Sequence, residues 1–207
     1  MMYDKIEGAP ARNMADIYIN NFKRALEITD KCFPPIHENI LYAEGGKRFI
    51  EWSEDSVSSV FAAPLDKRVG VLNFADSCTP GGLVWQGADT QEEALCRASN
   101  LYRYLESMED EYSINGKLIY TRDVVFFMDG RAKLRSPRKV DVITCSAPIS
   151  SIVDAERRMK MILDAARLNG VEWLILGKWG CGAFGNDWGE YKKMWNKVIA
   201  ESGWMDA

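Results

Sequence analysis

An α/β fold, with a largely parallel or mixed sheet covered by helices on both faces, is predicted by three features of this 207-residue sequence. Segments typical of strands and of amphipathic helices alternate along the chain. The later strand segments are apolar throughout, the pattern of strands buried on both faces. Two glycine-rich loops each follow an apolar strand and lead into a helix, which is where open α/β sheets bind ligands.

Composition limits the classes of protein to which this sequence can belong. The sequence is 47% hydrophobic and 27% charged, as in globular proteins, and its length predicts one domain over residues 1–207. A formal net charge of −4 argues against general affinity for nucleic acid backbones. No apolar stretch is long enough to cross a bilayer, and MMYDKIEGAPARNM lacks the apolar core of a signal peptide, so we expect a cytoplasmic protein without a membrane partner.

Metal and histidine chemistry are disfavoured. The single histidine, His37, lies in a loop-like stretch beside prolines. The five cysteines are odd in number, scattered and without Cys-x-x-Cys spacing, which predicts reduced thiols and no metal site. They are Cys32, Cys78, Cys96, Cys145 and Cys181. We therefore expect neither a metal nor a cofactor.

The N-terminal elements are predicted from the spacing of apolar residues and from the positions of proline and glycine. Apolar residues at helical spacing predict a helix over Asn13–Thr29, and two prolines make Cys32–Glu38 a loop. Asn39–Ala43 and Arg48–Trp52 are predicted to be the strands of a hairpin that turns at Gly45–Gly46.

Three more elements are predicted in the middle of the chain. Ser53–Ala63 begins with Ser-Glu-Asp, a good helix start, and stops before Pro64. Val69–Phe74 is an apolar run that predicts a buried strand. Asp123–Met128 is predicted to be a strand that ends in a turn at Asp129–Gly130.

The C-terminal part alternates between strand and helix. The basic, polar segment Arg131–Lys139 is predicted to be a solvated connection. Gly170 is expected to cap the predicted helix that ends at Asn169. The remaining predicted elements are a strand over Val140–Ala147 that ends at Pro148, a helix over Ile152–Asn169, a strand over Val171–Gly177 and a helix over Trp188–Glu201.

The segment Val69–Leu105 organises the chain. After its strand comes a turn-rich loop with Pro80, Gly81, Gly82 and Gly87. Gln91-Glu92-Glu93 then opens an amphipathic stretch that runs to Leu105, with two carboxylates in its first turn. Acidic residues in the first turn stabilise a helix by about 0.3–1 kcal/mol, so a purely structural role would also explain the two glutamates. Their place after a glycine-rich loop instead favours a site where backbone and carboxylates approach a ligand.

The second loop lies within Leu174–Trp188. Gly180, Gly182 and Gly185 spell G-x-G-x-x-G between a strand and a helix, so amide groups can converge on phosphate oxygens. A dinucleotide-binding Rossmann domain is thus one candidate. That fingerprint belongs to the first βα turn and needs further strands after it, whereas only a helix and a tail follow here.

A family resemblance joins these segments. PGGLVWQGADTQEEALCRASNLY resembles the signature of the poly(ADP-ribose) glycohydrolases, in which three glycines and a short spacer precede Gln-Glu-Glu. LNFADSCTPGG, IYTRDV, DVITCSAP and LILGKWGCGAFGND resemble other blocks of the bacterial-type branch, in matching order. Two departures lie at the ribose end: Leu83 replaces the third glycine, and Thr79 stands where the branch usually has an asparagine.

The resemblance implies a macrodomain-like three-layer α/β/α sandwich with a mixed central sheet that binds ADP-ribose. It implies that Glu93 is the catalytic acid and that Glu92 orients ribose hydroxyls. The loop Gly180–Asn186 would wrap the diphosphate, with Phe184 against the ribose. The implied ligand-binding residues are Asn73, Thr79, Pro80, Gly81, Gly82, Gly87, Ala88, Gln91, Gly180, Cys181, Gly182, Ala183, Phe184, Gly185 and Asn186.

Three functions stay open from the sequence. The first is an ADP-ribosyl glycohydrolase that cleaves the bond at the distal ribose of poly- or mono-ADP-ribose conjugates, with Glu93 as general acid and base. The second, motivated by Leu83 and Thr79, is a module that binds ADP-ribose without cleaving it. The third, based on the G-x-G-x-x-G match, is a different nucleotide enzyme, such as an NAD-dependent one. We expect ADP-ribose or an ADP-ribosylated substrate as partner, nucleic acid only as a modified substrate, and a monomer.

Overall fold

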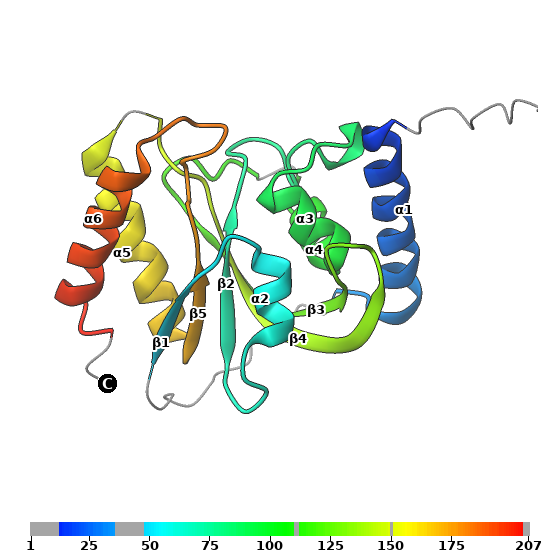
Figure 1. Ribbon diagram of the computed structural model, residues 1–207, viewed down its shortest axis with the longest axis horizontal. Coiled ribbons are helices and arrows are strands. Elements are labelled where there is room, and N and C mark those ends of the chain that lie inside the picture. Colours follow the sequence, from blue (N-terminus) through cyan, green and yellow to red (C-terminus); the bar gives the residue numbers. More distant parts are fainter. Residues whose placement is uncertain (1–12, 36–47, 110–111, 150, 205–207) are drawn as a thin grey trace, which may run out of the picture.

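The computed structural model describes residues 13–35, 48–109, 112–149 and 151–204, which form a five-stranded sheet in the order β1-β5-β2-β4-β3 (Figure 1). The strands are β1 (Phe49–Trp52), β2 (Val69–Phe74), β3 (Ile119–Met128), β4 (Leu134–Cys145) and β5 (Trp173–Leu176). The helices are α1 (Met14–Cys32), α2 (Ser56–Ala62), α3 (Gln91–Ala98), α4 (Leu101–Glu106), α5 (Ile152–Leu168) and α6 (Trp188–Glu201), with a short 3-10 helix, η1 (Val84–Gln86).

The sheet is mixed. β1, β5, β2 and β4 pair in parallel, and β3 pairs antiparallel with β4. Parallel strands end at the same edge of a sheet, so the segments that follow β2, β4 and β5 meet at one edge. Both glycine-rich loops belong to this edge.

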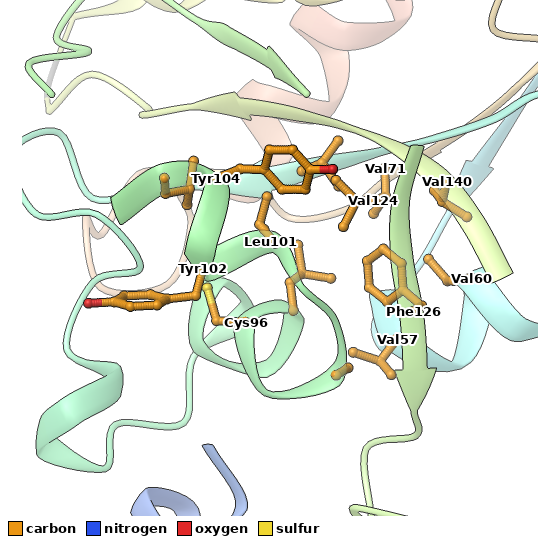
Figure 2. Packing of buried hydrophobic residues seen from close by; sticks show 14 of the residues in the cluster. Val57, Val60, Val71, Cys96, Leu101, Tyr102, Tyr104, Val124, Phe126 and Val140 are labelled. Carbon is orange, nitrogen blue, oxygen red and sulfur yellow. The ribbon is translucent and has the colours of Figure 1, made fainter. Parts of the chain in front are cut away.

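Helices cover both faces of the sheet, and two large buried clusters fill most of the space between, beside a small one of Ala25, Phe127 and Met128. Successive residues of β2 point to opposite faces, so Val71 joins one cluster and Leu72 the other. The first cluster packs α1 to α4 against the sheet, and Figure 2 shows Val57 and Val60 of α2 beside Phe126 of β3. The second packs α5 and α6 against the opposite face. The predicted α/β fold with helices on both faces is confirmed.

Most predicted elements are found close to their expected bounds. β2 and α6 match the prediction at both ends, and the Asp187 side chain accepts from the Glu190 amide at the start of α6 (2.8 Å). Gly170, with φ of 71°, directly follows the Asn169 cap of α5. Residues 39–43 and 45–46 of the predicted hairpin, and His37, lie outside the described residues. Within them, β1 pairs in parallel with β5.

The prediction of a solvated connection over Arg131–Lys139 was wrong from Leu134 onward. Leu134–Lys139 is the first half of β4, where Val125 of β3 pairs with Lys139 and Met128 pairs with Leu134. This half of the strand is largely exposed, so its side chains carry no apolar pattern. Backbone hydrogen bonds to β3 form regardless of side-chain polarity, which explains the error.

The single helical stretch expected from Gln91 to Leu105 is broken in two. Ser99 is extended, with φ of −147° and ψ of 179°, and forms an isolated bridge with Phe126. The Asn100 side chain then accepts a hydrogen bond from the Val125 amide (2.8 Å). Ser and Asn readily replace helical bonds with such side-chain bonds, and the break fixes α3 against the edge of β3. No helix in the described part of the chain has the length and apolarity needed to cross a membrane.

Candidate active site

A pocket of about 390 Å³ lies where the strands β2, β4 and β5 end. Its walls come from the end of β2, the loop that enters α3, the turn after β4 and the loop after β5. They comprise Phe74, Asp76, Gly82, Leu83, Ala88, Thr90, Gln91, Glu92, Glu93, Ala147, Lys178, Trp179, Gly180, Cys181, Gly182, Ala183 and Phe184. The two glycine-rich loops, far apart in sequence, therefore line one pocket.

Glu93 is held by hydrogen bonds on both carboxylate oxygens. It is 4% exposed and forms a capping box with Thr90 at the start of α3. The Leu83 amide donates to Oε1 (2.9 Å), and the Thr90 amide donates to Oε2 (2.9 Å), as does the Thr90 hydroxyl. These donors come from the loop before α3, so the conformation of that loop sets the orientation of the carboxylate.

Glu92 lies deeper and is 2% exposed. Its Oε1 accepts from the Asn73 side chain (3.1 Å) and its Oε2 from the Asp76 amide (2.7 Å). The pKa of Glu92 is raised to about 8: burial raises it most, the two hydrogen bonds lower it, and the charge of Glu93 adds to the increase. This upward shift favours the protonated form of Glu92 near neutral pH, and a protonated carboxyl group can donate a hydrogen bond.

Asn73 supports this acid from within the sheet. Its side chain is fully buried and donates to Glu92 and, at 3.3 Å, to the Thr144 hydroxyl of β4. The Asn73 Oδ1 has no hydrogen-bond partner in the described residues. Asn73 does not line the pocket, so the structure places it behind Glu92.

Gln91 borders the pocket, yet its amide group is used by the fold. Its Oε1 accepts from the Phe74 amide (2.9 Å), and its Nε2 donates to the Leu72 carbonyl (2.7 Å). The same Nε2 donates to the Ser56 hydroxyl of α2 (3.0 Å). Gln91 thus fixes the start of α3 to the last residues of β2, which aims the two following glutamates at the pocket.

Asp76 was missed by the sequence analysis. Its Oδ1 accepts from the amides of Cys78 (2.8 Å) and Thr79 (2.7 Å), which closes the turn after β2, while its own amide donates to Glu92. An Asp followed by Ser-Cys-Thr-Pro is a recognisable side-chain-closed turn, and that signal could have found it. Thr79 itself is exposed and, like Pro80, is not part of the pocket wall.

Glycine is required at Gly82 by its contact with the carboxylates. Its φ is +60°, and a Cβ there would lie 2.4 Å from the Glu93 Oε1. Gly81 and Gly87 also have positive φ and abut Tyr102 and Ala15 respectively. Leu83 has φ of −100°, so this position does not need glycine. Its amide reaches Glu93, and its side chain is 47% exposed at the pocket wall.

The loop after β5 offers unused backbone donors. The Asn186 side chain donates to the carbonyls of Gly180 (2.9 Å) and Pro148 (3.0 Å), which closes the loop. The amides of Gly182, Ala183 and Phe184 make no hydrogen bond to the described part of the chain. Such consecutive free amides in a pocket wall can bind an anion. Asn186 and Gly185 lie outside the wall and shape the loop.

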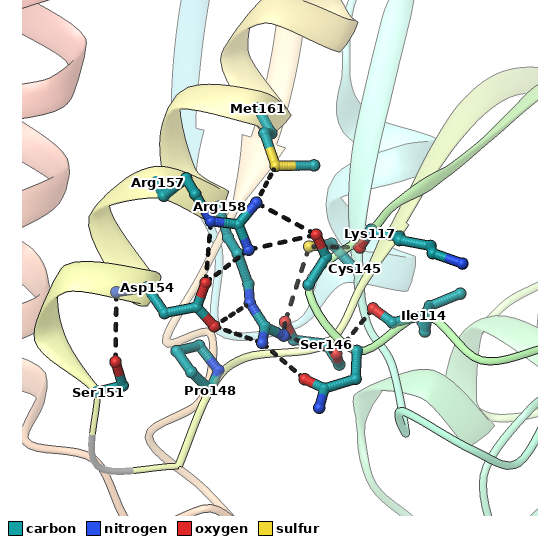
Figure 3. A network of polar contacts seen from close by, with 12 residues as sticks. Ile114, Lys117, Cys145, Ser146, Pro148, Ser151, Asp154, Arg157, Arg158 and Met161 are labelled. Atoms are coloured by element: carbon teal, nitrogen blue, oxygen red, sulfur yellow. Dashed lines mark hydrogen bonds and ion pairs between the residues drawn. The ribbon is translucent and has the colours of Figure 1, made fainter.

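A buried polar network holds the turn after β4, which lies against this loop (Figure 3). Arg158 of α5 donates to the carbonyl (2.7 Å) and hydroxyl (2.9 Å) of Ser146, and its Nε donates to Asp154 (2.8 Å). These bonds fix the turn after β4, whose Ala147 lines the pocket and lies against Gly180. Ala147 could not be recognised from the sequence as a pocket residue because this turn carries no glycine or charge.

The remaining walls are aromatic or weakly charged. Lys178 is the one cation in the wall among the described residues, and it pairs with Glu54 (2.8 Å) at the surface. Trp179 is buried and donates to the Cys145 carbonyl (2.9 Å). Trp85 donates to the Tyr102 hydroxyl (2.8 Å) and is not part of the pocket wall.

Two glycines of this loop should respond differently to alanine. Gly180 has φ of +75°, and a Cβ there would lie 2.5 Å from the Ala147 Cβ, so Gly180→Ala should lower the free energy of unfolding by about 2 kcal/mol or more. A Cβ on Gly182 meets nothing within 4 Å, so Gly182→Ala should change stability by less than about 0.5 kcal/mol. Urea unfolding measures both; equal losses would contradict this loop geometry.

Comparison with known proteins finds one matching family and several solved structures with a similar fold. The family model described as microbial-type PARG, catalytic domain, matches residues 15–129, more than half of the chain. No curated protein matches significantly. A solved variant of poly(ADP-ribose) glycohydrolase from Thermomonospora curvata is 24% identical over 89% of this chain and 86% of its own, with a TM-score of 0.67.

Two solved structures with bound ligands are also similar. Thermomonospora curvata poly(ADP-ribose) glycohydrolase with the inhibitor ADP-HPD is 26% identical over 96% of this chain and 79% of its own, with a TM-score of 0.59. The Deinococcus radiodurans enzyme in complex with ADP-ribose is 23% identical over 91% of this chain and 79% of its own, with a TM-score of 0.63. The implied macrodomain-like fold is therefore confirmed.

Proposed function

The chain belongs to the family of microbial-type PARG catalytic domains, and from that premise we propose that it hydrolyses the glycosidic bond at the distal ribose of ADP-ribose conjugates. The observation that carries the proposal is one pocket with two buried adjacent glutamates on one side and a loop of unused amides on the other. Glycoside hydrolysis needs the carboxyl groups, and a diphosphate needs the backbone amides.

ADP-ribose is the expected ligand because solved relatives hold ADP-ribose and ADP-HPD. We place its diphosphate against the amides of Gly182, Ala183 and Phe184, since no cation in the pocket wall other than Lys178 is available to neutralise it. The distal ribose then lies toward Glu92 and Glu93. The neutral Glu92 donates a hydrogen bond to a ribose hydroxyl, a role that its raised pKa supports.

Glu93 is the proposed general acid and base. As the C1″–oxygen bond of the distal ribose breaks, Glu93 gives its proton to the leaving oxygen, and positive charge develops at C1″. The negative charge of the bound diphosphate stabilises the positive charge that develops at C1″. Water then adds to C1″ and returns a proton to Glu93. The products are ADP-ribose and the free acceptor.

The direct test is product release from defined substrates. We expect the purified chain to release ADP-ribose, identified by mass spectrometry, from at least one of poly(ADP-ribose), mono-ADP-ribosylated protein and mono-ADP-ribosylated nucleic acid. Calorimetry with ADP-ribose and with NAD accompanies the assay. ADP-ribose binding without release from any substrate supports the binding module, and NAD binding without ADP-ribose binding supports the NAD-dependent enzyme.

The non-catalytic module is the second candidate because Thr79 and Leu83 depart from the family signature. The geometry limits the effect of Leu83. Its backbone still donates to Glu93, and the contact that requires glycine is made by Gly82. Thr79 contributes its amide and carbonyl to the turn, which any residue can supply. Both departures therefore bear on substrate choice more than on the orientation of the carboxylates.

A further inference from the structure

Arg97 lies on α3, four residues after Glu93, and reaches back to the loop before the helix. It is 8% exposed. Its Nη1 donates to the Ala88 carbonyl (2.7 Å), its Nη2 pairs with the Asp89 carboxylate, and its guanidinium lies over the Tyr18 ring of α1, 4.6 Å from the centroid. The Tyr18 hydroxyl is hydrogen-bonded to the same Asp89. One buried cation thus fixes two consecutive residues of the loop.

The next residue of that loop is Thr90. Its amide and hydroxyl supply two of the three hydrogen bonds that hold Glu93. We propose that Arg97 is a positioning residue, which locks Ala88 and Asp89 so that Thr90 keeps the Glu93 carboxylate in its reactive orientation. This inference rests on the proposed function, because it assigns Arg97 a part in the reaction through Glu93.

The loop has few other supports on this side. Ala88 donates to the Leu83 carbonyl at 3.3 Å, and Gly87 lies against Ala15 of α1. The Asp89 side chain is half exposed, so solvent competes for it once its cation is gone. A planar guanidinium can bind a carbonyl and a carboxylate together while it stacks on a ring, which an ammonium group cannot do. Lysine should therefore restore only part of the lock.

A shift of about 1 Å at a catalytic group can cost about 100-fold in rate. We expect Arg97→Met to lower kcat at least about tenfold, with KM and the Kd for ADP-ribose within about twofold of the parent, because the diphosphate loop lies elsewhere in the pocket. The kcat of Arg97→Lys should lie between those of the parent and of Arg97→Met. Arg103→Met is the matched control, since Arg103 of α4 pairs with Asp30 of α1 and with Glu106, outside the pocket wall.

Hydrogen exchange at the Thr90 amide gives a readout that does not need activity. We expect Arg97→Met to lose protection at Thr90 while amides in the middle of β2 keep theirs, and Arg103→Met to leave Thr90 protected. Unchanged protection at Thr90, or a kcat loss no larger than in Arg103→Met, would overturn the positioning role. A wild-type chain that releases no ADP-ribose contradicts the proposed function, while the exchange experiment still tests the lock.

Discussion

Replacing Glu93 with glutamine should slow the release of ADP-ribose by about 100- to 10,000-fold. Glutamine has nearly the same shape but cannot give a proton to the leaving oxygen or take one from water. Its carbonyl can still accept from the Leu83 amide, whereas its NH₂ group then faces both Thr90 donors: the hydroxyl can turn to accept from it, and the Thr90 amide loses its acceptor. That loss costs about 0.5–1.5 kcal/mol of stability, which leaves the fold intact. Single-turnover rates measure the chemical step.

The control exchange is Glu190→Gln. Glu190 is also an acid in the first turn of a helix, α6, but it is exposed and outside the pocket wall. It should leave the rate unchanged. The Kd for ADP-ribose should stay within about tenfold in Glu93→Gln, because the diphosphate contacts remain. A Glu93→Gln variant that turns over as fast as the parent would remove Glu93 from the mechanism and return attention to Glu92.

The sequence was most informative where local chemistry decides the structure. β2 is apolar at nearly every position and bounded by charged or turn residues, and its bounds were predicted correctly. The glycine loops were recognisable because positive φ at Gly82 and Gly180 excludes most other residues. Both loops follow parallel strands, so their meeting at one edge follows from topology once the strands are assigned.

The errors arose where distant residues decide the structure. Ser99 leaves the helix because it pairs with Phe126, which lies on another strand. Leu134–Lys139 joins the sheet through backbone bonds that its polar side chains do not announce. The hydrogen bonds of Gln91 to Leu72, Phe74 and Ser56 could not be foreseen either, because these partners come from two other elements. No local pattern encodes such pairings.

Proton allocation between the glutamates is likewise a tertiary property, and it predicts a strong pH dependence of stability. The folded-state pKa of Glu92 is about 8, against an ordinary value of 4.5, because the side chain is buried. The folded state therefore binds this proton more tightly than the unfolded state. The contribution of Glu92 to stability is fully present below the unfolded pKa and is lost as pH rises through about 8.

The slope is about 1.4 kcal/mol per pH unit between these two pKa values, so Glu92 should cost the wild type about 4 kcal/mol between pH 5 and pH 8. Asp141, whose pKa burial also raises, changes stability in the same direction. Comparison with Glu92→Gln isolates the effect, because glutamine cannot ionise and keeps an oxygen for the Asp76 amide or for Asn73.

Urea unfolding at pH 5, 6, 7 and 8 measures the difference between Glu92→Gln and the wild type, which should shift in favour of the variant by about 4 kcal/mol over this range. Glu190→Gln, the same exchange at an exposed position outside the pocket wall, is measured alongside as the control. Parallel curves for Glu92→Gln and the wild type would mean that Glu92 is already ionised at pH 5. A charged Glu92 could not donate to a ribose hydroxyl, and the division of roles between the two glutamates would have to be reversed.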